Sequence, residues 1–335
     1  MSDNVHVLHR PLAWQGSLWA SLIDALHKDH LPHGLLLYGH NGVGKLHFAK
    51  AMANYLLCAS PTGNEACGQC HACLLNKAGS HPDLFLAQPE EPGKAIKVDL
   101  IRELNKFVAQ TSQMSGRKVV IIEPADAMNI NSSNALLKTL EEPSGDTHLI
   151  LVVDSISSLM ATIRSRCQYY EVPAPSAQQT KQYLSERFPE RNDIDFLSDI
   201  SGGGPFYAID LVDSGKLAWR SLISDGLMAV AKGESSALVA EQWKSIEIME
   251  ALHWLQLWVE DMVRVLMTQN IELTSSVDLK PLLQMMLDKP VDPRYVLRFR
   301  EIILEMMDAA IHSHPNKQLV YDRLLIDWKT LFSAK

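Results

Sequence analysis

The sequence predicts an α/β domain with a parallel sheet covered by helices on both faces, followed by a helical C-terminal region. In the first half of the chain, short apolar runs alternate with amphipathic segments, whereas from about residue 215 onward only helical periodicity is found. The apolar runs are rich in Val, Ile and Leu and lack polar alternation. This composition is typical of parallel strands that are buried on both faces.

Four strand and helix pairs follow one another along the first half. Each apolar run predicts a strand, and the amphipathic segment after it predicts the helix that returns the chain to the sheet. The expected strands are 33–39, 83–88, 117–123 and 147–153, and the expected helices are 46–58, 98–108, 131–142 and 157–165. The segment 168–175 ends this pattern, because Pro173 and Pro175 mark a boundary.

Three domains are expected: a sheet domain at 1–172, a small helical lid at 173–214 and a helical C-terminal domain at 215–335. Ser176 is expected to cap the first lid helix. In the C-terminal domain, an apolar stripe over 248–266 is broader than a surface helix needs. Burial inside the bundle is the favoured interpretation, and packing against a neighbouring subunit is the alternative.

The overall composition is that of an ordinary globular protein. The chain carries 31 Lys and Arg against 39 Asp and Glu, a net charge of −8, which argues against a long phosphate-neutralising surface. No apolar run reaches the ~18 residues of a membrane span, and the N-terminus lacks the basic and apolar regions of a secretory signal. A cytoplasmic protein without membrane contact is expected.

Four of the five cysteines lie within sixteen residues, which predicts a metal site at 58–73. They are Cys58, Cys67, Cys70 and Cys73. Two Cys-x-x-Cys steps bring three thiolates together, and Cys58 completes the tetrahedral four-sulfur shell of a structural Zn²⁺ ion. No coordination position then remains open for catalysis. His71 is an alternative ligand, and free thiols or a redox pair are alternative roles.

A glycine-rich segment, GHNGVGK at 39–45, lies between the first expected strand and its helix. In this context it matches the phosphate loop of nucleotide-binding proteins. Gly39, Gly42 and Gly44 allow main-chain N–H groups to turn toward an anion, and Lys45 adds a full positive charge.

The residues that organise Mg²⁺ and water in phosphate-loop ATPases are altered. Leu46 replaces the Ser or Thr whose hydroxyl binds Mg²⁺. The third expected strand ends in Glu123, and Pro124 follows it, where an ATPase has Asp followed by Glu; Asp126 is out of register. We expect no useful ATP hydrolysis. Two alternatives stay open for the loop: that it still binds ATP or ADP, or that it is an inherited empty fold.

Arg166 follows the last expected helix of the sheet domain. An arginine at the rim of a nucleotide-binding domain can reach into a neighbour's site and stabilise the charge of phosphoryl transfer. A surface arginine is more often solvated or ion-paired, so spacing alone favours that simpler interpretation. Arg164 is an alternative for the same role.

The cysteine cluster, the glycine-rich loop, NALLKTLEEP at 134–143 and SRC at 165–167 occur in this order. With these motifs the chain resembles the delta-prime family of the bacterial DNA polymerase III clamp loader. NKQLVYDRLL at 316–325 is similar to a terminal helix of these subunits. The resemblance implies an AAA+ module: a RecA-like domain, a helical lid and a C-terminal collar that assembles a hetero-pentameric ring.

The resemblance also implies a role in DNA replication. In such a ring, gamma or tau subunits hydrolyse ATP, and delta-prime is a non-hydrolysing stator that presents the SRC arginine, here Arg166, to the adjacent ATP site. The implied partners are gamma/tau and delta, and through the assembly the beta sliding clamp and primed DNA. The four-cysteine zinc site belongs to the family. Val153 and Asp154 stand where a sensor Thr or Asn would be, and the lid segment 201–212 lacks a sensor arginine.

Two other functions stay open at this point. An ATP-hydrolysing gamma-type subunit would lose its own ATPase activity when Lys45 is changed. A zinc-dependent nucleic-acid-binding module acting without a ring needs a basic face beside the cysteines, whereas 58–73 contains no Lys or Arg.

Overall fold

The computed structural model describes residues 10–91, 93–114, 116–274, 276–289, 291–313 and 315–333. The chain divides into two compact units. The sheet unit extends to Tyr183 and includes Gly203–Tyr207, and the helical unit comprises Leu184–Gly202 and the residues from Ala208 onward. None of the helices in the described ranges is both long and apolar enough to span a lipid bilayer.

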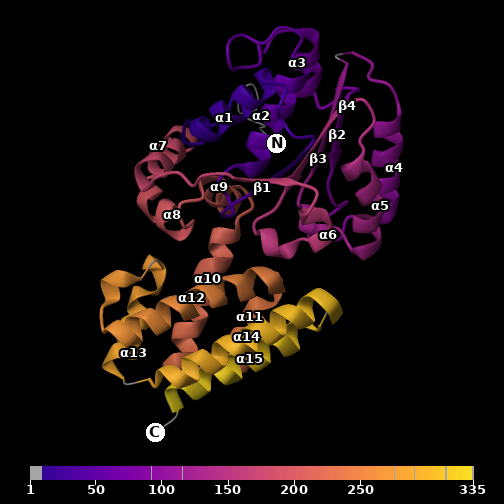
Figure 1. Cartoon of the computed structure of the whole chain (residues 1–335). Coiled ribbons are helices and arrows are strands. Elements are labelled where there is room, and N and C mark those ends of the chain that lie inside the picture. Colours follow the sequence, from indigo (N-terminus) through magenta and orange to yellow (C-terminus); the bar gives the residue numbers. More distant parts are fainter. Residues whose placement is uncertain are drawn as a thin grey trace. The chain divides into compact units, whose positions relative to one another are not determined.

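The sheet unit contains five parallel strands in the order β2-β3-β4-β1-β5 (Figure 1). They are β1 (Gly34–Tyr38), β2 (Leu84–Ala87), β3 (Arg117–Ile122), β4 (Asp146–Val152) and β5 (Gln168–Glu171). Because the strands are parallel, their carboxyl ends all lie at one edge of the sheet, here named the carboxyl edge. Their amino ends lie at the opposite edge, the amino edge.

The helices of the sheet unit return the chain from one strand to the next. They are α1 (Gly16–His27), α2 (Lys45–Leu57), α3 (His71–Lys77), α4 (Val98–Ala109), α5 (Ile130–Glu141) and α6 (Ala161–Arg164), with the 3₁₀ turns η1 (Ala13–Gln15), η2 (Ala125–Ala127) and η3 (Ile156–Ser158). Two further helices, α7 (Ala177–Arg187) and α9 (Pro205–Asp213), contain residues of both units. The predicted cap of α7 is confirmed, because Ser176 Oγ accepts a hydrogen bond from Gln179 N at 3.2 Å.

Helices cover both faces of the sheet, which confirms the predicted α/β fold class. Successive strand residues point to opposite faces, so two apolar clusters form. Leu35 and Leu37 of β1 belong to the cluster with α1 and α2. Leu36 belongs to the cluster with α4, α5 and α6. Figure 1 shows α1 and α2 on one side of the sheet and α4 and α5 on the other.

The structure differs from the sequence pattern at the end of the sheet unit. The pattern does not reveal β5, because this edge strand exposes three of its four residues and has no continuous apolar run. The predicted helix 157–165 is divided into η3 and α6. The pattern also does not single out α1, whose buried face includes Leu22 and Ile23.

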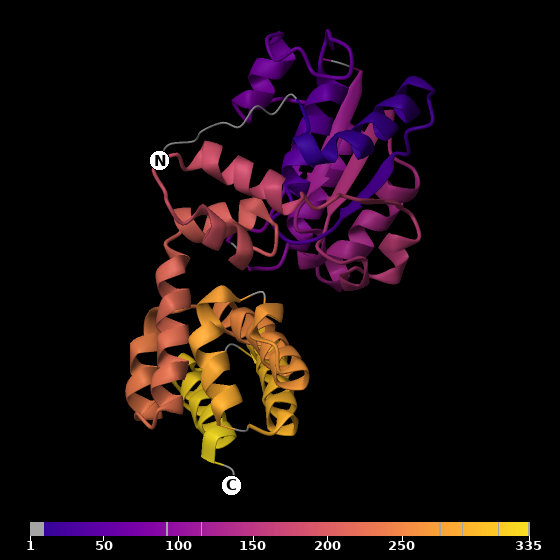
Figure 2. The same cartoon turned by 90° about the vertical axis from the view of Figure 1, so that its left-hand side faces the viewer.

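The helical unit is built from helices alone within its described residues (Figure 2). They are α8 (Ile194–Ile200), α10 (Lys216–Ala231), α11 (Ser236–Gln242), α12 (Ile248–Thr268), α13 (Lys280–Asp288), α14 (Pro293–Ser313) and α15 (Lys317–Ser333), with the turns η4 (Trp243–Ser245), η5 (Ile271–Leu273) and η6 (Val277–Leu279). α12 packs against α10, α13 and α14 and buries Trp254 and Trp258 completely. Burial of its apolar stripe inside the bundle is therefore confirmed.

Candidate functional site

The glycine-rich loop lies at the carboxyl edge, between β1 and α2. Gly39, Gly42 and Gly44 have φ angles of 148°, 77° and 88°, in the range that favours glycine. Steric crowding also requires glycine at two of these positions. A Cβ at Gly42 would lie 2.6 Å from Tyr207 N, and one at Gly44 would lie 2.8 Å from Phe206 Cε2. The loop therefore packs closely against the residues around Phe206.

Lys45, the first residue of α2, uses its ammonium group inside the loop. Its Nζ donates to the carbonyl oxygens of Gly39 at 2.9 Å and His40 at 2.7 Å, and forms an ion pair with Asp154 Oδ1 at 2.6 Å. Asp154 follows β4, the neighbour of β1, so the carboxyl edge brings the two charges together. An ammonium has three N–H donors, and these acceptors occupy all of them. The Lys45 side chain is only 7% exposed.

Other segments of the sheet unit hold the loop through its carbonyl groups. Trp14 Nε1 donates to Val43 O at 3.0 Å, and Gln15 Nε2 donates to Gly44 O at 3.0 Å. Phe206 N donates to Gly42 O at 2.9 Å. The loop conformation therefore rests on hydrogen bonds within this chain.

The acidic position after β3 is also satisfied internally. Glu123 Oε2 accepts a hydrogen bond from Gln88 Nε2 at 2.7 Å, and Pro124 follows it. Asp126 is exposed in η2, and Leu46 is half-buried beside Lys45. Leu46 has no hydroxyl with which to bind Mg²⁺, and Pro124 has no carboxylate with which to orient a nucleophile.

Arg166 lies at the amino edge, two residues before β5 begins. β5 pairs with β1 so that Gln168 is opposite Leu35, and a Cβ at Gly34 would lie 3.1 Å from Arg166 O. The Lys45 contacts, by contrast, follow the other end of β1. A five-residue strand spans roughly 15 Å, so Lys45 and Arg166 lie at opposite ends of the same strand.

The Arg166 guanidinium is anchored to α5 and α6. Its Nε donates to Glu141 Oε1 at 2.7 Å, and its Nη2 forms an ion pair with the same oxygen. Its Nη1 donates to Thr162 O at 2.8 Å and to Ser165 Oγ at 3.3 Å. The side chain is 32% exposed. Arg166 is therefore held in place at the rim while part of it still meets solvent.

Arg164 and Cys167, which are close to Arg166 in the sequence, are less suited to binding a ligand. Arg164 closes α6, and its Nε is buried without a hydrogen-bond partner among the described residues. Burial raises the pKa of the Cys167 thiol to about 12, which makes it a poor nucleophile or metal ligand at neutral pH.

The four predicted cysteines converge on one point. Their sulfur atoms all lie within 4.8 Å of one another. The Sγ of Cys58 is 3.5 Å from that of Cys67 and 3.9 Å from that of Cys70, and the Sγ of Cys67 is 3.9 Å from that of Cys73. A tetrahedral zinc ion with Zn–S bonds of about 2.3 Å requires sulfur atoms about 3.8 Å apart. The cluster therefore fits zinc, and the exposed His71 is not one of the group.

Local structure supplies both the geometry and part of the electrostatics of this cluster. Cys58 caps α2, and Cys73 lies in α3. Burial raises the pKa of Cys58 and Cys73. Burial acts the same way on Cys70, but hydrogen bonds to its sulfur lower its pKa to about 6. A cation among the four sulfurs would stabilise all of them as thiolates.

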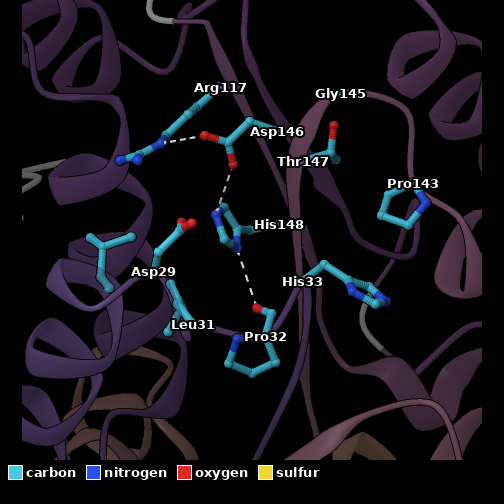
Figure 3. A pocket seen from close by; sticks show the side chains of 11 residues that line it. Asp29, Leu31, Pro32, His33, Arg117, Pro143, Gly145, Asp146, Thr147 and His148 are labelled. Carbon is cyan, nitrogen blue, oxygen red and sulfur yellow. Dashed lines mark hydrogen bonds and ion pairs between the residues drawn. The ribbon is translucent and has the colours of Figure 1, made fainter.

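A separate cavity of about 340 Å³ opens at the amino edge of the sheet. Figure 3 shows its charged wall, in which Arg117 Nε donates to Asp146 Oδ2 at 2.7 Å. His148 lies between Asp146 Oδ1 at 3.2 Å and Pro32 O at 3.3 Å, and burial lowers its pKa. This cavity lies at the opposite edge from the glycine-rich loop.

Comparison with known proteins decides the family. Over 322 residues, which cover 95% of this chain and 97% of the relative, the sequence is 37% identical to DNA polymerase III subunit delta' of Pseudomonas aeruginosa. This chain belongs to the delta-prime family. A second delta-prime subunit, from Escherichia coli, is 31% identical over 234 residues, covering 69% of this chain and 70% of the relative. A family model described as "DNA polymerase III, delta subunit" matches residues 14–176.

This delta-prime chain is therefore a clamp-loader subunit of DNA polymerase III, and the predicted AAA+ fold is confirmed. Among solved structures, a DNA polymerase III gamma subunit-related protein of Thermotoga maritima is 16% identical, with a TM-score of 0.48. The match covers 96% of this chain and 100% of that chain.

Two side-chain partners are not assigned from the sequence. Glu141, the partner of Arg166, is the first Glu of LEEP at 140–143, and Asp154, the partner of Lys45, follows β4. Both pairs join residues that are far apart in sequence. Only the pairing of α5 with α6 and of β1 with β4 brings them together.

Proposed function

We propose that this delta-prime subunit does not hydrolyse ATP and instead presents Arg166 to the ATP site of a neighbouring gamma-type subunit. The observation that carries the proposal is the position of the two cations at opposite ends of β1. Arg166 is too far from the chain's own loop to serve it, so any triphosphate that it meets belongs to another subunit.

The side chains at the carboxyl edge of the sheet support the proposal that this subunit does not hydrolyse ATP. The Lys45 ammonium is committed to two carbonyl groups and Asp154, so it has no N–H donor left for a phosphate oxygen. Leu46 cannot bind Mg²⁺, and Glu123 accepts a hydrogen bond from Gln88 with Pro124 beside it. Phosphoryl transfer depends on a held metal and an oriented nucleophile, and neither is provided here.

The architecture supports a stator. The proposed divisions are an AAA+ domain at 1–172, a lid at 173–214 and a collar at 215–335 that joins gamma/tau and delta subunits in a hetero-pentameric ring. This ring loads the beta sliding clamp onto primed DNA. A structural Zn²⁺ ion, held by the four sulfurs at 58–73, would fix the loop between α2 and α3.

The test uses the reconstituted clamp loader with full-length Arg166→Ala and, as a matched control, Arg164→Ala. An arginine finger is worth roughly 10³ to 10⁵ in turnover at its site. We expect Arg166→Ala to leave the mass of the assembly unchanged and to remove the DNA-stimulated ATPase contribution of one site, whereas Arg164→Ala retains it. Full ATPase activity in an assembled Arg166→Ala complex would refute the proposal, as would ATP hydrolysis by the isolated wild-type chain.

A further inference from the structure

We infer that Glu141 is a positioning residue that holds Arg166 in the geometry needed to meet a neighbour's phosphate. The inference rests on the proposed function of Arg166. Glu141 is the last residue of α5, and its Oε1 accepts from both Nε and Nη2 of Arg166. Thr162 O accepts from Nη1 on the other side of the guanidinium. The plane of the guanidinium is thereby fixed by two helices.

The main chain beneath Arg166 is fixed independently of Glu141. Arg166 N donates to Ile163 O at 3.1 Å, and the Arg166 carbonyl packs against Gly34 of β1. A rigid main chain still leaves an arginine with several rotatable bonds, whose ordering costs conformational entropy. Glu141 removes much of this freedom before a phosphate arrives, and such preorganisation raises turnover rather than substrate affinity.

The donors that remain suit a phosphate oxygen. A guanidinium has five N–H donors, of which four are used by Glu141, Thr162 and Ser165. The fifth, on Nη2, has no acceptor among the described residues. The weak 3.3 Å contact with Ser165 Oγ can also be exchanged for a stronger acceptor. Glu141 therefore holds the inner side of the group and leaves its tip for the neighbour.

Stability does not account for this pair. The Glu141 and Arg166 side chains are 48% and 32% exposed, and ion pairs this exposed contribute little to the stability of a fold. Removing Glu141 should therefore change activity in the assembly without unfolding the chain. The adjacent Glu142 is exposed and forms no ion pair within the described ranges, so it provides a matched control for loss of negative charge.

The experiment measures the DNA-stimulated ATPase of the complete clamp loader with full-length variants whose assembly is confirmed by mass. The variants are Glu141→Ala, Glu141→Gln, Glu142→Gln, Arg166→Ala and the double variant Glu141→Ala with Arg166→Ala. Glu141→Ala should cause at least about half of the decrease in kcat caused by Arg166→Ala, with KM for ATP changed less than about twofold. Glu141→Gln keeps a hydrogen-bond acceptor without the charge and should be intermediate. Glu142→Gln should match the wild type.

The double variant separates positioning from a general structural effect. If Glu141 acts through Arg166, the double variant should have the kcat of Arg166→Ala alone. Wild-type or higher kcat for Glu141→Ala, or additive losses in the double variant, would overturn the inference. A complex that is fully active with Arg166→Ala would instead overturn the proposed function. If Glu141→Ala does not assemble, an assembled Glu141→Gln complex with wild-type kcat is equally decisive against positioning.

Discussion

Lys45 and Arg166 are the two cations of the sheet unit that sequence motifs connect with phosphate, and their surroundings are opposite. Lys45 is 7% exposed and gives all three N–H groups to acceptors of its own chain. Arg166 is 32% exposed, has one N–H without an acceptor in the part of the chain that the structure describes, and lies at the other edge of the sheet. A cation is therefore used within the chain at one edge and stays partly exposed to solvent at the other.

Whether a glycine-rich loop can bind a phosphate depends on the N–H donors that its lysine still has free. A carboxylate at Asp154 neutralises Lys45 where a phosphate would otherwise do so. The loop thus keeps the glycine geometry of a phosphate site while its charge is already balanced. Substitutions at Lys45, Asp154 and Arg166 test whether the two cations differ in this way.

The largest contrast is expected between Lys45→Met and Arg166→Ala in the assembled complex. Lys45→Met should keep ATPase turnover within about twofold of wild type, whereas loss of the arginine should remove one site's turnover. Lys45→Met should instead destabilise the isolated chain by about 1 to 2 kcal/mol, because buried carbonyl groups lose their donor. Steady-state ATPase assays and urea unfolding measure the two effects. A large ATPase loss with Lys45→Met would contradict the comparison.

Metal removal should act on α2, which begins at Lys45 and ends just before Cys58. Chelation of zinc from the purified chain should lower its melting temperature by about 5 to 10 °C, because the sulfur cluster at the end of this helix loses its cross-link. Thermal unfolding followed by circular dichroism measures the shift. A chelator should have no further effect on a Cys70→Ser variant. An unchanged melting temperature of the wild type, together with no zinc by elemental analysis, would contradict the metal site.

Asp154→Asn should make the buried Lys45 ammonium more available to a phosphate, because the ammonium loses its charged partner. The Asp154 carboxylate is 61% exposed, and ion pairs with such an exposed partner contribute about 0 to 1 kcal/mol, so affinity for ATP should rise by up to about fivefold. Equilibrium binding with labelled ATP measures this change. The exposed Asp126 is the matched control, and Asp126→Asn should bind no better than wild type. Equal affinity in all three chains, or tight ATP binding by wild type, would show that Asp154 does not block the loop.

The smallest effect is expected from lowering the pH, which should reduce the stability of the fold through His148 at the amino edge. Burial lowers the pKa of His148 below its ordinary value of 6.5. Below pH 6.5 the unfolded chain binds this proton more readily than the folded chain, so stability should fall as pH decreases, and this effect is absent above pH 6.5. Melting temperatures between pH 7 and 5 measure it, and His148→Gln should give a shallower dependence. Identical pH profiles would contradict this assignment.

Much of the fold was predictable because its signal is local. The inner strands β1, β3 and β4 contain continuous apolar runs, since burial on both faces excludes polar residues there. The edge strand β2 is also apolar in sequence, whereas the other edge strand, β5, has no apolar run and exposes three of its four residues. The cysteine cluster was predictable for a similar reason: the spacing of Cys67, Cys70 and Cys73 limits how far apart their sulfurs can lie.

The fold class, the sulfur-rich loop, the family motifs and the residue types at each candidate site can be predicted from the amino-acid sequence alone. The three-dimensional packing is needed to show which cation is used within the chain and which stays partly exposed. Asp154 is 109 positions from Lys45, and Glu141 is 25 positions from Arg166. No local periodicity encodes such pairs, because strand order and helix packing alone determine which distant charges meet, and those contacts decide how many donors remain for a ligand.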